Sequence, residues 1–178
     1  KDLRELHKKG APYSDFAALR TEIERSGILE RNQLSGAYAE IAAWFAIRRE
    51  YETREPVKED DMGGIDLWVY PEIRAENGEV RNIWWAIQIK SRIDYQQAEA
   101  RVLAHDDPEA IKMRETARNS STIPQDAIVV PIRINIPGGE TNEMYNIMTG
   151  KPTETLINQI NEGLYEILDE QNKMFGAQ

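Results

Sequence analysis

The segment Ile83–Lys90 is the feature that most restricts the fold. It is rich in aromatic and β-branched residues, which favour strands, and it is apolar enough to lie inside a sheet. The segment Ile65–Tyr70 is a second short apolar strand, and the polar link Pro71–Asn82 between them predicts a hairpin connection. The chain is therefore expected to build a sheet around these two central strands.

Helices and further strands surround this pair along the chain. Apolar spacing, capping residues and glycine stops predict helices over Ser14–Ser26, Ser35–Arg49, Tyr95–Leu103, Pro108–Asn119 and Thr153–Asn172. Ser14 and Asp107 are the expected caps of two of these helices. Extended segments are expected over Tyr51–Val57, as an edge strand, and over Ala127–Ile134, with a strand end or kink at Pro131.

This order of elements predicts an α/β fold with a mixed β-sheet core flanked by helices. An extra helix precedes the core, and the amphipathic helix that follows it has an apolar stripe of Leu156, Ile160, Leu164 and Leu168. We expect a single domain over residues 1–178, comprising an N-terminal helical extension at 1–34, a core at about 35–135, and a loop plus C-terminal helix at 136–178.

Composition limits the classes of protein to which the chain can belong. The 178 residues include no cysteine, which excludes disulfides and cysteine-ligated metal sites. No apolar run has membrane-spanning length, so we expect a soluble, intracellular (cytoplasmic) protein. The net charge of −9 argues against broad adhesion to nucleic acid but leaves room for a local site. Residues 35–80 hold 5 basic and 11 acidic side chains, a regional charge of −6.

Four polar residues stand where apolar side chains are expected. Glu40 falls within the apolar stripe of the Ser35–Arg49 helix. Asp66 lies at the start of the first central strand, and Gln88 and Lys90 share one face near the end of the second, roughly 7 Å apart along the strand. If the two strands are neighbours, Asp66, Gln88 and Lys90 meet in one pocket.

These residues allow a structural interpretation and a chemical one. Structurally, Glu40 would reach solvent or an arginine at a helix boundary, and Asp66 would form an ion pair with Lys90. Chemically, carboxylate and amide oxygens suit a hard cation such as Mg²⁺, and a lysine beside them would orient a water or hold a phosphate. The combination of all four residues favours the chemical interpretation.

The segments that carry these residues resemble the motifs of the PD-(D/E)XK nuclease superfamily, which has the restriction-endonuclease-like fold. The matching segments are Gly36–Glu40, Gly63–Leu67 and Ala86–Ser91, with 26 residues from the Glu to the Asp and 22 from the Asp to the Gln. In that family a helix carries a Glu, a hairpin strand carries the Asp, and a later strand ends in Asp/Glu-x-Lys before a helix. The resemblance covers about residues 35–135.

Two positions depart from the family pattern. Ile65 stands where the family has Pro, and Gln88 stands where it has an acidic residue. Family members that tolerate Gln there often take charge from a helix Glu, so Glu40 gains importance. The resemblance implies a metal-dependent DNA endonuclease of restriction, recombination, repair or mobile-element type, with Mg²⁺ or Mn²⁺ as cofactor.

The resemblance also implies roles for single residues. Glu40, Asp66 and Gln88 would hold the metal, together with the backbone carbonyl of Ile89. The catalytic set would be Glu40, Asp66, Gln88 and Lys90. In this set Lys90 would position the attacking water and the scissile phosphate.

Candidate contacts to the DNA backbone lie just past the catalytic lysine and on basic residues further along the chain. They are Ser91, Arg92, Arg101, Lys112, Arg114 and Arg118. The alternative for the basic residues of the Pro108–Asn119 helix is an ordinary solvated face. Cutting both strands needs two sites, so a symmetric homodimer is one expected partner, and a protein that helps to hold the DNA is another.

Two rival interpretations stay open. A nuclease-like fold retained as a catalytically inactive binding or assembly module is favoured by the acidic surface and by Gln88. An unrelated α/β interaction protein with an Asp66–Lys90 ion pair is the other. The run Glu59–Asp61 is interpreted as a solvated turn in preference to an outer metal ligand. We expect Trp68, Trp84 and Trp85 to line the core or the walls of a pocket.

Overall fold

The computed structural model describes residues 3–27, 31–57, 64–75, 78–94, 96–119, 123–124, 126–137 and 143–176. Its helices are α1 (Leu3–Lys8), α2 (Tyr13–Ser26), α3 (Arg31–Arg48), α5 (Pro108–Arg118) and α6 (Glu154–Gly176). Its strands are β1 (Thr53–Arg54), β2 (Leu67–Val69), β3 (Glu72–Arg74), β4 (Val80–Asn82), β5 (Trp85–Ile93), β6 (Glu99–Val102) and β7 (Ile128–Ile136).

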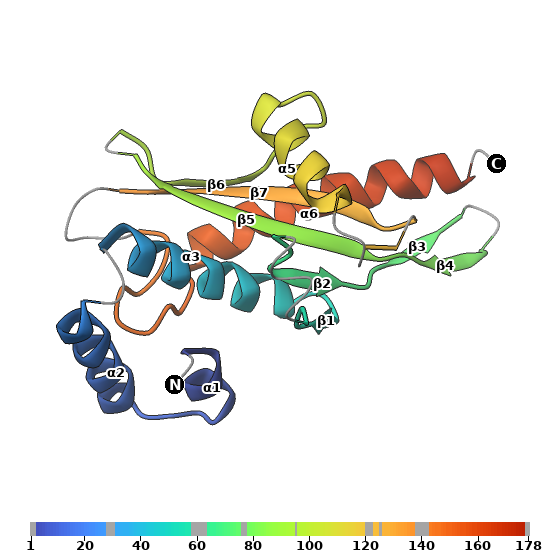
Figure 1. Ribbon diagram of the computed structural model, residues 1–178. Coiled ribbons are helices and arrows are strands. Elements are labelled where there is room, and N and C mark those ends of the chain that lie inside the picture. The colour runs from blue at the N-terminus through green and yellow to red at the C-terminus, as the bar shows by residue number, and fades with distance from the viewer. Residues whose placement is uncertain are drawn as a thin grey trace.

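The central sheet is mixed (Figure 1). Within the described ranges its strand order is β1-β2-β5-β7-β6, while β3 and β4 pair in a separate two-stranded sheet. The neighbours β1 and β2, β2 and β5, and β7 and β6 are antiparallel, whereas β5 and β7 are parallel. The pair β5–β7 stays in register from Trp85 opposite Ile128 to Ile93 opposite Ile136 and forms the centre of the sheet. The mixed α/β architecture predicted from the sequence is therefore confirmed.

Helices cover both faces of this sheet. Ile47 of α3 and Ile160 of α6 share the larger buried core with Ile87 of β5. On the opposite face, Ala117 of α5 belongs to a second core with Ala86, the residue before Ile87. Consecutive strand residues point to opposite faces, so α3 and α6 lie on one side and α5 on the other, as Figure 1 shows.

The two strands predicted as central pair as expected, with Leu67 opposite Ile87 and Val69 opposite Trp85 in antiparallel register. β2 is shorter than predicted, and β5 runs on to Ile93. The link between them is not a plain loop, because it folds into the β3–β4 ribbon. β1 is the expected edge strand but is reduced to Thr53–Arg54.

The helix predicted over Tyr95–Leu103 is wrong, because part of this segment forms strand β6. β6 pairs with the outer side of β7, from Glu99 opposite Asn135 to Val102 opposite Ile132. Residues with mixed local preferences become a strand where a neighbouring edge offers backbone hydrogen bonds, and only the tertiary fold supplies that edge.

Pro131 lies inside β7, which runs on to Ile136, so the strand end predicted there is wrong. Its carbonyl accepts a hydrogen bond from the backbone N–H of Leu103 at 2.9 Å, one residue past the end of β6. The N–H and C=O of a strand residue point to the same neighbour, so the proline ring removes one donor just where β6 leaves β7. β7 therefore continues through the proline at the cost of one ladder bond.

The two predicted caps have different outcomes. α2 begins at Tyr13, and Ser14 lies inside it with its hydroxyl 3.4 Å from the Asp15 carboxylate, so the Ser14 cap is wrong. The Asp107 cap of α5 is confirmed, because its carboxylate accepts from the N–H of Glu109 at 2.8 Å and of Ala110 at 3.4 Å.

The stripe of the last helix is confirmed. Leu156, Ile160 and Leu164 of α6 are fully buried, and Leu168 packs at the margin of the same core. α3 begins four residues before the predicted Ser35. None of the helices in the described part of the chain has both the length and the apolar character needed to cross a membrane.

Candidate functional site

Asp66 lies just before Leu67, the first residue of β2, at the point where pairing with β5 stops. Its backbone N–H donates to the carbonyl of Ile87 at 2.9 Å, and its carboxylate oxygen Oδ2 accepts from the N–H of Ile89 at 2.6 Å. The carboxylate therefore takes the place of a strand carbonyl just past the last β2–β5 pair. These two bonds hold Asp66 beside the strand position between Ile87 and Ile89, which is Gln88.

Gln88 is almost completely buried, with 2% of its surface exposed. Among the described residues its side-chain oxygen Oε1 has no hydrogen-bond partner. Gly64, two residues before Asp66, passes so close that an added Cβ would lie 2.9 Å from Gln88 Nε2, and its φ of +80° favours glycine. An orphaned buried amide oxygen is costly, so it marks a place that a hydrogen-bond donor or a cation would complete.

Lys90 follows on the same face of β5 and is exposed. It forms no ion pair within 4.0 Å with any acidic side chain of the described residues. The structural ion pair between Asp66 and Lys90, which the sequence allowed, is thus not formed. The ammonium group is available to an external anion.

Glu40 approaches the same strand from the other face of the sheet. It is half-buried on α3, one helical turn after Gly36. An added Cβ on Gly36 would lie 3.4 Å from Ser91 Oγ, so this part of α3 packs closely against β5. Ser91 therefore faces α3, and its side chain lies on the opposite face of β5 from Lys90.

The donor set just before the start of β2 fits a hard divalent cation. It contains a carboxylate held in place at Asp66 and a neutral oxygen without a described partner at Gln88. No group of three or more His, Cys, Asp or Glu side chains within the described ranges is arranged as a metal site. A cation here would thus be held by the Asp66 carboxylate, the Gln88 oxygen and the Ile89 carbonyl, whereas α3 carries Glu40 on the opposite face of β5. The run Glu59–Asp61 lies outside the described residues.

The predicted DNA contacts fall into two groups. Arg92 and Arg101 are exposed on β5 and β6, and Arg92 Nε donates to Asn135 Oδ1 at 2.9 Å. Lys112 and Arg118 are exposed on α5.

Arg114, also on α5, has a structural role. Its guanidinium donates to the carbonyls of His105 at 2.8 Å and Val129 at 3.4 Å, which ties α5 to the sheet. Burial lowers the pKa of this guanidinium.

The sequence analysis missed Arg133. This arginine is 7% exposed on β7, and its guanidinium pairs with the carboxylates of Asp107, at 3.6 Å, and Glu109. The parallel register places it directly beside Lys90. An arginine inside an otherwise apolar strand segment was the signal that could have identified it.

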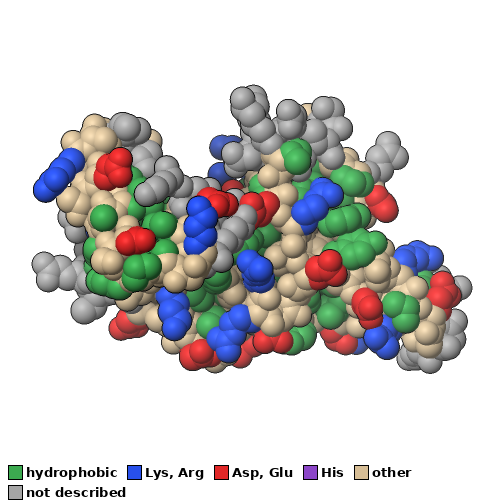
Figure 2. Space-filling view, turned by 90° about the horizontal axis from the view of Figure 1, so that it is seen from below, with side chains coloured by type: hydrophobic (Ala, Val, Ile, Leu, Met, Phe, Trp, Pro, Cys, Tyr) green, Lys and Arg blue, Asp and Glu red, His purple; other side chains and the backbone are tan. Residues whose placement is uncertain are grey.

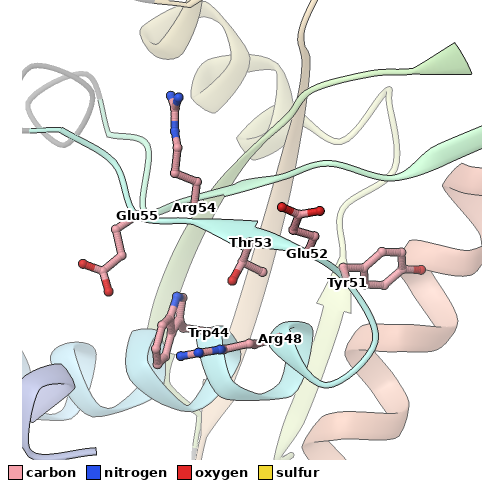
Figure 3. A pocket seen from close by; sticks show the side chains of 7 residues that line it. All are labelled: Trp44, Arg48, Tyr51, Glu52, Thr53, Arg54 and Glu55. Atoms are coloured by element: carbon pink, nitrogen blue, oxygen red, sulfur yellow. The ribbon is translucent and has the colours of Figure 1, made fainter. Parts of the chain in front are cut away.

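A cavity of about 490 Å³ lies between the C-terminal half of α3 and β1, as Figure 3 shows. Trp44 and Arg48 form its α3 wall, and Thr53 and Glu55 lie across from them. The Arg48 guanidinium lies 4.9 Å from the centre of the Trp44 ring. Trp44 is 3% exposed, so this ring is part of the core more than of the cavity surface.

The other tryptophans follow the prediction that they line the core. Trp68 and Trp85 are buried, and Trp84 is half-buried with Trp68 and Tyr70 against it. Arg54 covers Trp84 at 5.0 Å from the ring centre.

Comparison with known proteins gives no match among family models, curated proteins or solved structures. The assignment of function therefore depends on the geometry of the site and on the motifs that the sequence carries.

Proposed function

We propose that the chain is a divalent-metal-dependent deoxyribonuclease. Its active site would be formed by Asp66, Gln88 and Lys90 and would hydrolyse phosphodiester bonds of DNA. The observation that carries this proposal is the buried Gln88 oxygen, which has no partner among the described residues and belongs to the residue before Ile89, whose N–H anchors the Asp66 carboxylate. An exposed lysine two residues further on the same face adds the cation that a phosphate requires.

The element order supports the same proposal. α3 carries Glu40, the antiparallel pair β2–β5 carries Asp66 and the Gln-x-Lys motif, and α5 and β7 follow. Apart from strand β6, which stands between β5 and α5, this is the order that the resemblance to the PD-(D/E)XK nucleases implies. The parallel placement of β7 beside β5 puts the motif-bearing strand in the middle of the sheet.

Each residue has a task that its surroundings suit. The Asp66 carboxylate, oriented by the Ile89 N–H, and the Gln88 oxygen would hold Mg²⁺ or Mn²⁺ together with the Ile89 carbonyl, and Glu40 stays on the opposite face of β5. The bound cation supplies a Lewis acid for the phosphate. The Lys90 ammonium group meets the non-bridging phosphate oxygens and orients the attacking water.

A plasmid assay tests the proposal. Supercoiled plasmid is incubated with the protein and Mg²⁺ or Mn²⁺, and nicked and linear products are separated on a gel. We expect Asp66→Ala and Lys90→Ala to lose about 10²–10³-fold in rate, as for removal of a single charge-stabilising group. Lys151→Ala, which removes an exposed lysine outside the candidate site and the candidate DNA contacts, is the matched control and keeps the activity. Cleavage that persists in Lys90→Ala or in EDTA would reject the mechanism.

A binding module without catalysis is the second candidate. It is favoured by the neutral Gln88 and by the mixed charge of the face seen in Figure 2, where basic and acidic side chains are interspersed on the side of α3. Calorimetry with Mn²⁺ separates the two candidates. No detectable Mn²⁺ binding, together with no cleavage of duplex, single-stranded or branched DNA, would favour the binding module.

A further inference from the structure

Three basic side chains form a row across three neighbouring strands. Lys90 on β5 lies opposite Arg133 on β7, and Arg133 lies opposite Arg101 on β6. Residues directly opposite each other in a sheet share a face, so all three point to the side of α5. Strands are spaced about 4.8 Å apart, which puts the ends of this cation row about 10 Å apart at the backbone.

The acidic residues near the cation row act mainly on its centre. Asp107 and Glu109, at the start of α5, both pair with the Arg133 guanidinium. In the part of the chain that the structure describes, no acidic side chain lies within ion-pair distance of Lys90 or Arg101, and both are exposed. The two ends of the row therefore face solvent while its centre is held by the protein.

Arg101 lies near this cluster as well. The pKa of Asp107 is lowered, first by the hydrogen bond from the Glu109 N–H and further by the positive charges of Arg133 and Arg101. Asp107, one of the two acids that hold Arg133, is thus within the electrostatic reach of Arg101 too. Neutralising one of them would raise the positive potential over the whole row.

We propose that the two exposed ends of the cation row bind phosphates of the substrate strand and lead it from Arg101 on β6 to the cleavage site at Lys90. This inference rests on the proposed function, because Lys90 belongs to both. Phosphates of one B-form strand follow each other at about 3.4 Å along the axis, so 10 Å spans about three nucleotides. Arg101 thus meets a phosphate two or three nucleotides from the one that is cut.

Equilibrium binding tests the cation row without requiring catalysis. A fluorescein-labelled DNA duplex is titrated with the full chain in EDTA, and anisotropy is followed at several salt concentrations. Arg101→Ala is expected to weaken DNA binding. Because the variant loses one phosphate contact, the ratio of wild-type to variant affinity should fall about 3.5-fold as the salt concentration rises from about 50 to 200 mM. Arg25→Ala removes the same charge from an exposed position in the last turn of α2, outside the candidate DNA contacts, and is the matched control.

A second pair of variants tests whether DNA binding becomes tighter when a negative charge next to the cation row is removed. Glu109→Gln removes a charge that compensates Arg133, so DNA binding becomes several-fold tighter, whereas Glu115→Gln, an exposed change on α5, has little effect. Circular dichroism confirms that each variant is folded. Equal affinities of Arg101→Ala and Arg25→Ala, or no tightening in Glu109→Gln, would overturn the inference.

The inference and the proposed function fail in different ways. Cleavage by the wild type with no dependence of binding on Arg101 rejects the cation row and leaves the nuclease standing. Binding that depends on Arg101, with no cleavage under any condition, supports the cation row and rejects the nuclease. Competition by polyglutamate as strong as that by unlabelled DNA would overturn the assignment to nucleic acid.

Discussion

Replacement of Gln88 by glutamate examines the candidate metal site most directly. The side chain keeps its size but gains a carboxylate in a position that is 2% exposed, where the existing oxygen has no described partner. Burial raises the pKa of a carboxyl group, and fully buried glutamates reach about 8–9 against about 4.3 in an unfolded chain. At neutral pH the Gln88→Glu variant would therefore be less stable than the wild type, whether the new carboxyl group takes up a proton on folding or stays ionised in the buried position.

The size of the effect follows from that difference. If the folded pKa exceeds 7, the cost at pH 7 is about 1.36 × (7 − 4.3), or about 3.7 kcal/mol, as an upper limit. The sign is that of an acid whose pKa is higher in the folded than in the unfolded state. The free energy of unfolding equals that of the wild type below about pH 4 and falls as the pH rises toward the pKa of the folded state. A cation at the site reverses the loss, and binding at 100 times its Kd adds about 2.7 kcal/mol.

Urea unfolding at several pH values, with and without Mg²⁺, measures both parts. Gln97→Glu, the same change at an exposed position, is the matched control and should show neither effect. If Gln88→Glu were as stable as the wild type at neutral pH, the buried environment of this side chain would be refuted. A loss that Mg²⁺ and Mn²⁺ fail to reverse would refute the cation site.

Three further predictions concern the surroundings of the site and the core. Gly64→Ala should lower the free energy of unfolding by about 1–2 kcal/mol, because φ is +80° and the new Cβ lies 2.9 Å from Gln88 Nε2; unchanged urea unfolding would contradict this close approach. Gly163→Ala gains about 1 kcal/mol of helix propensity, yet its Cβ would lie 2.7 Å from Val102 Cγ2, so we expect a net loss that Val102→Ala relieves in the double variant. Burial raises the pKa of Tyr51 to about 12, so the free energy of unfolding should fall as the pH rises from about 10 to 12, and Tyr51→Phe should flatten that slope.

Strong local patterns were sufficient for much of the fold. The apolar strands around Leu67 and Ile87 and the stripe of α6 appear as predicted, because burial of a continuous apolar face dominates any alternative. The Asp107 cap was also predictable, since an aspartate before Pro108 satisfies orphan N–H groups locally. β6 was not predictable in this way, because its pairing partners on β7 are 30 to 36 residues away in the chain.

The candidate site was likewise predictable only where local sequence patterns decide the arrangement. The sequence by itself determined that Gln88 and Lys90 share a face of an apolar strand, because strand alternation follows from backbone geometry alone. It also singled out Asp66 and Glu40 as polar residues among apolar ones. Only the tertiary structure decided that the Asp66 carboxylate bonds to Ile89, since this contact depends on where β2 separates from β5.

Tertiary structure alone also produced the cation row. Lys90, Arg101 and Arg133 are scattered over 44 residues of sequence, and no local pattern links them. They align because β7 inserts between β5 and β6 and sets both registers at once. Strand alternation is encoded residue by residue, whereas strand order and register result from the packing of the whole sheet against its helices, so the face of each side chain was predictable and its neighbours were not.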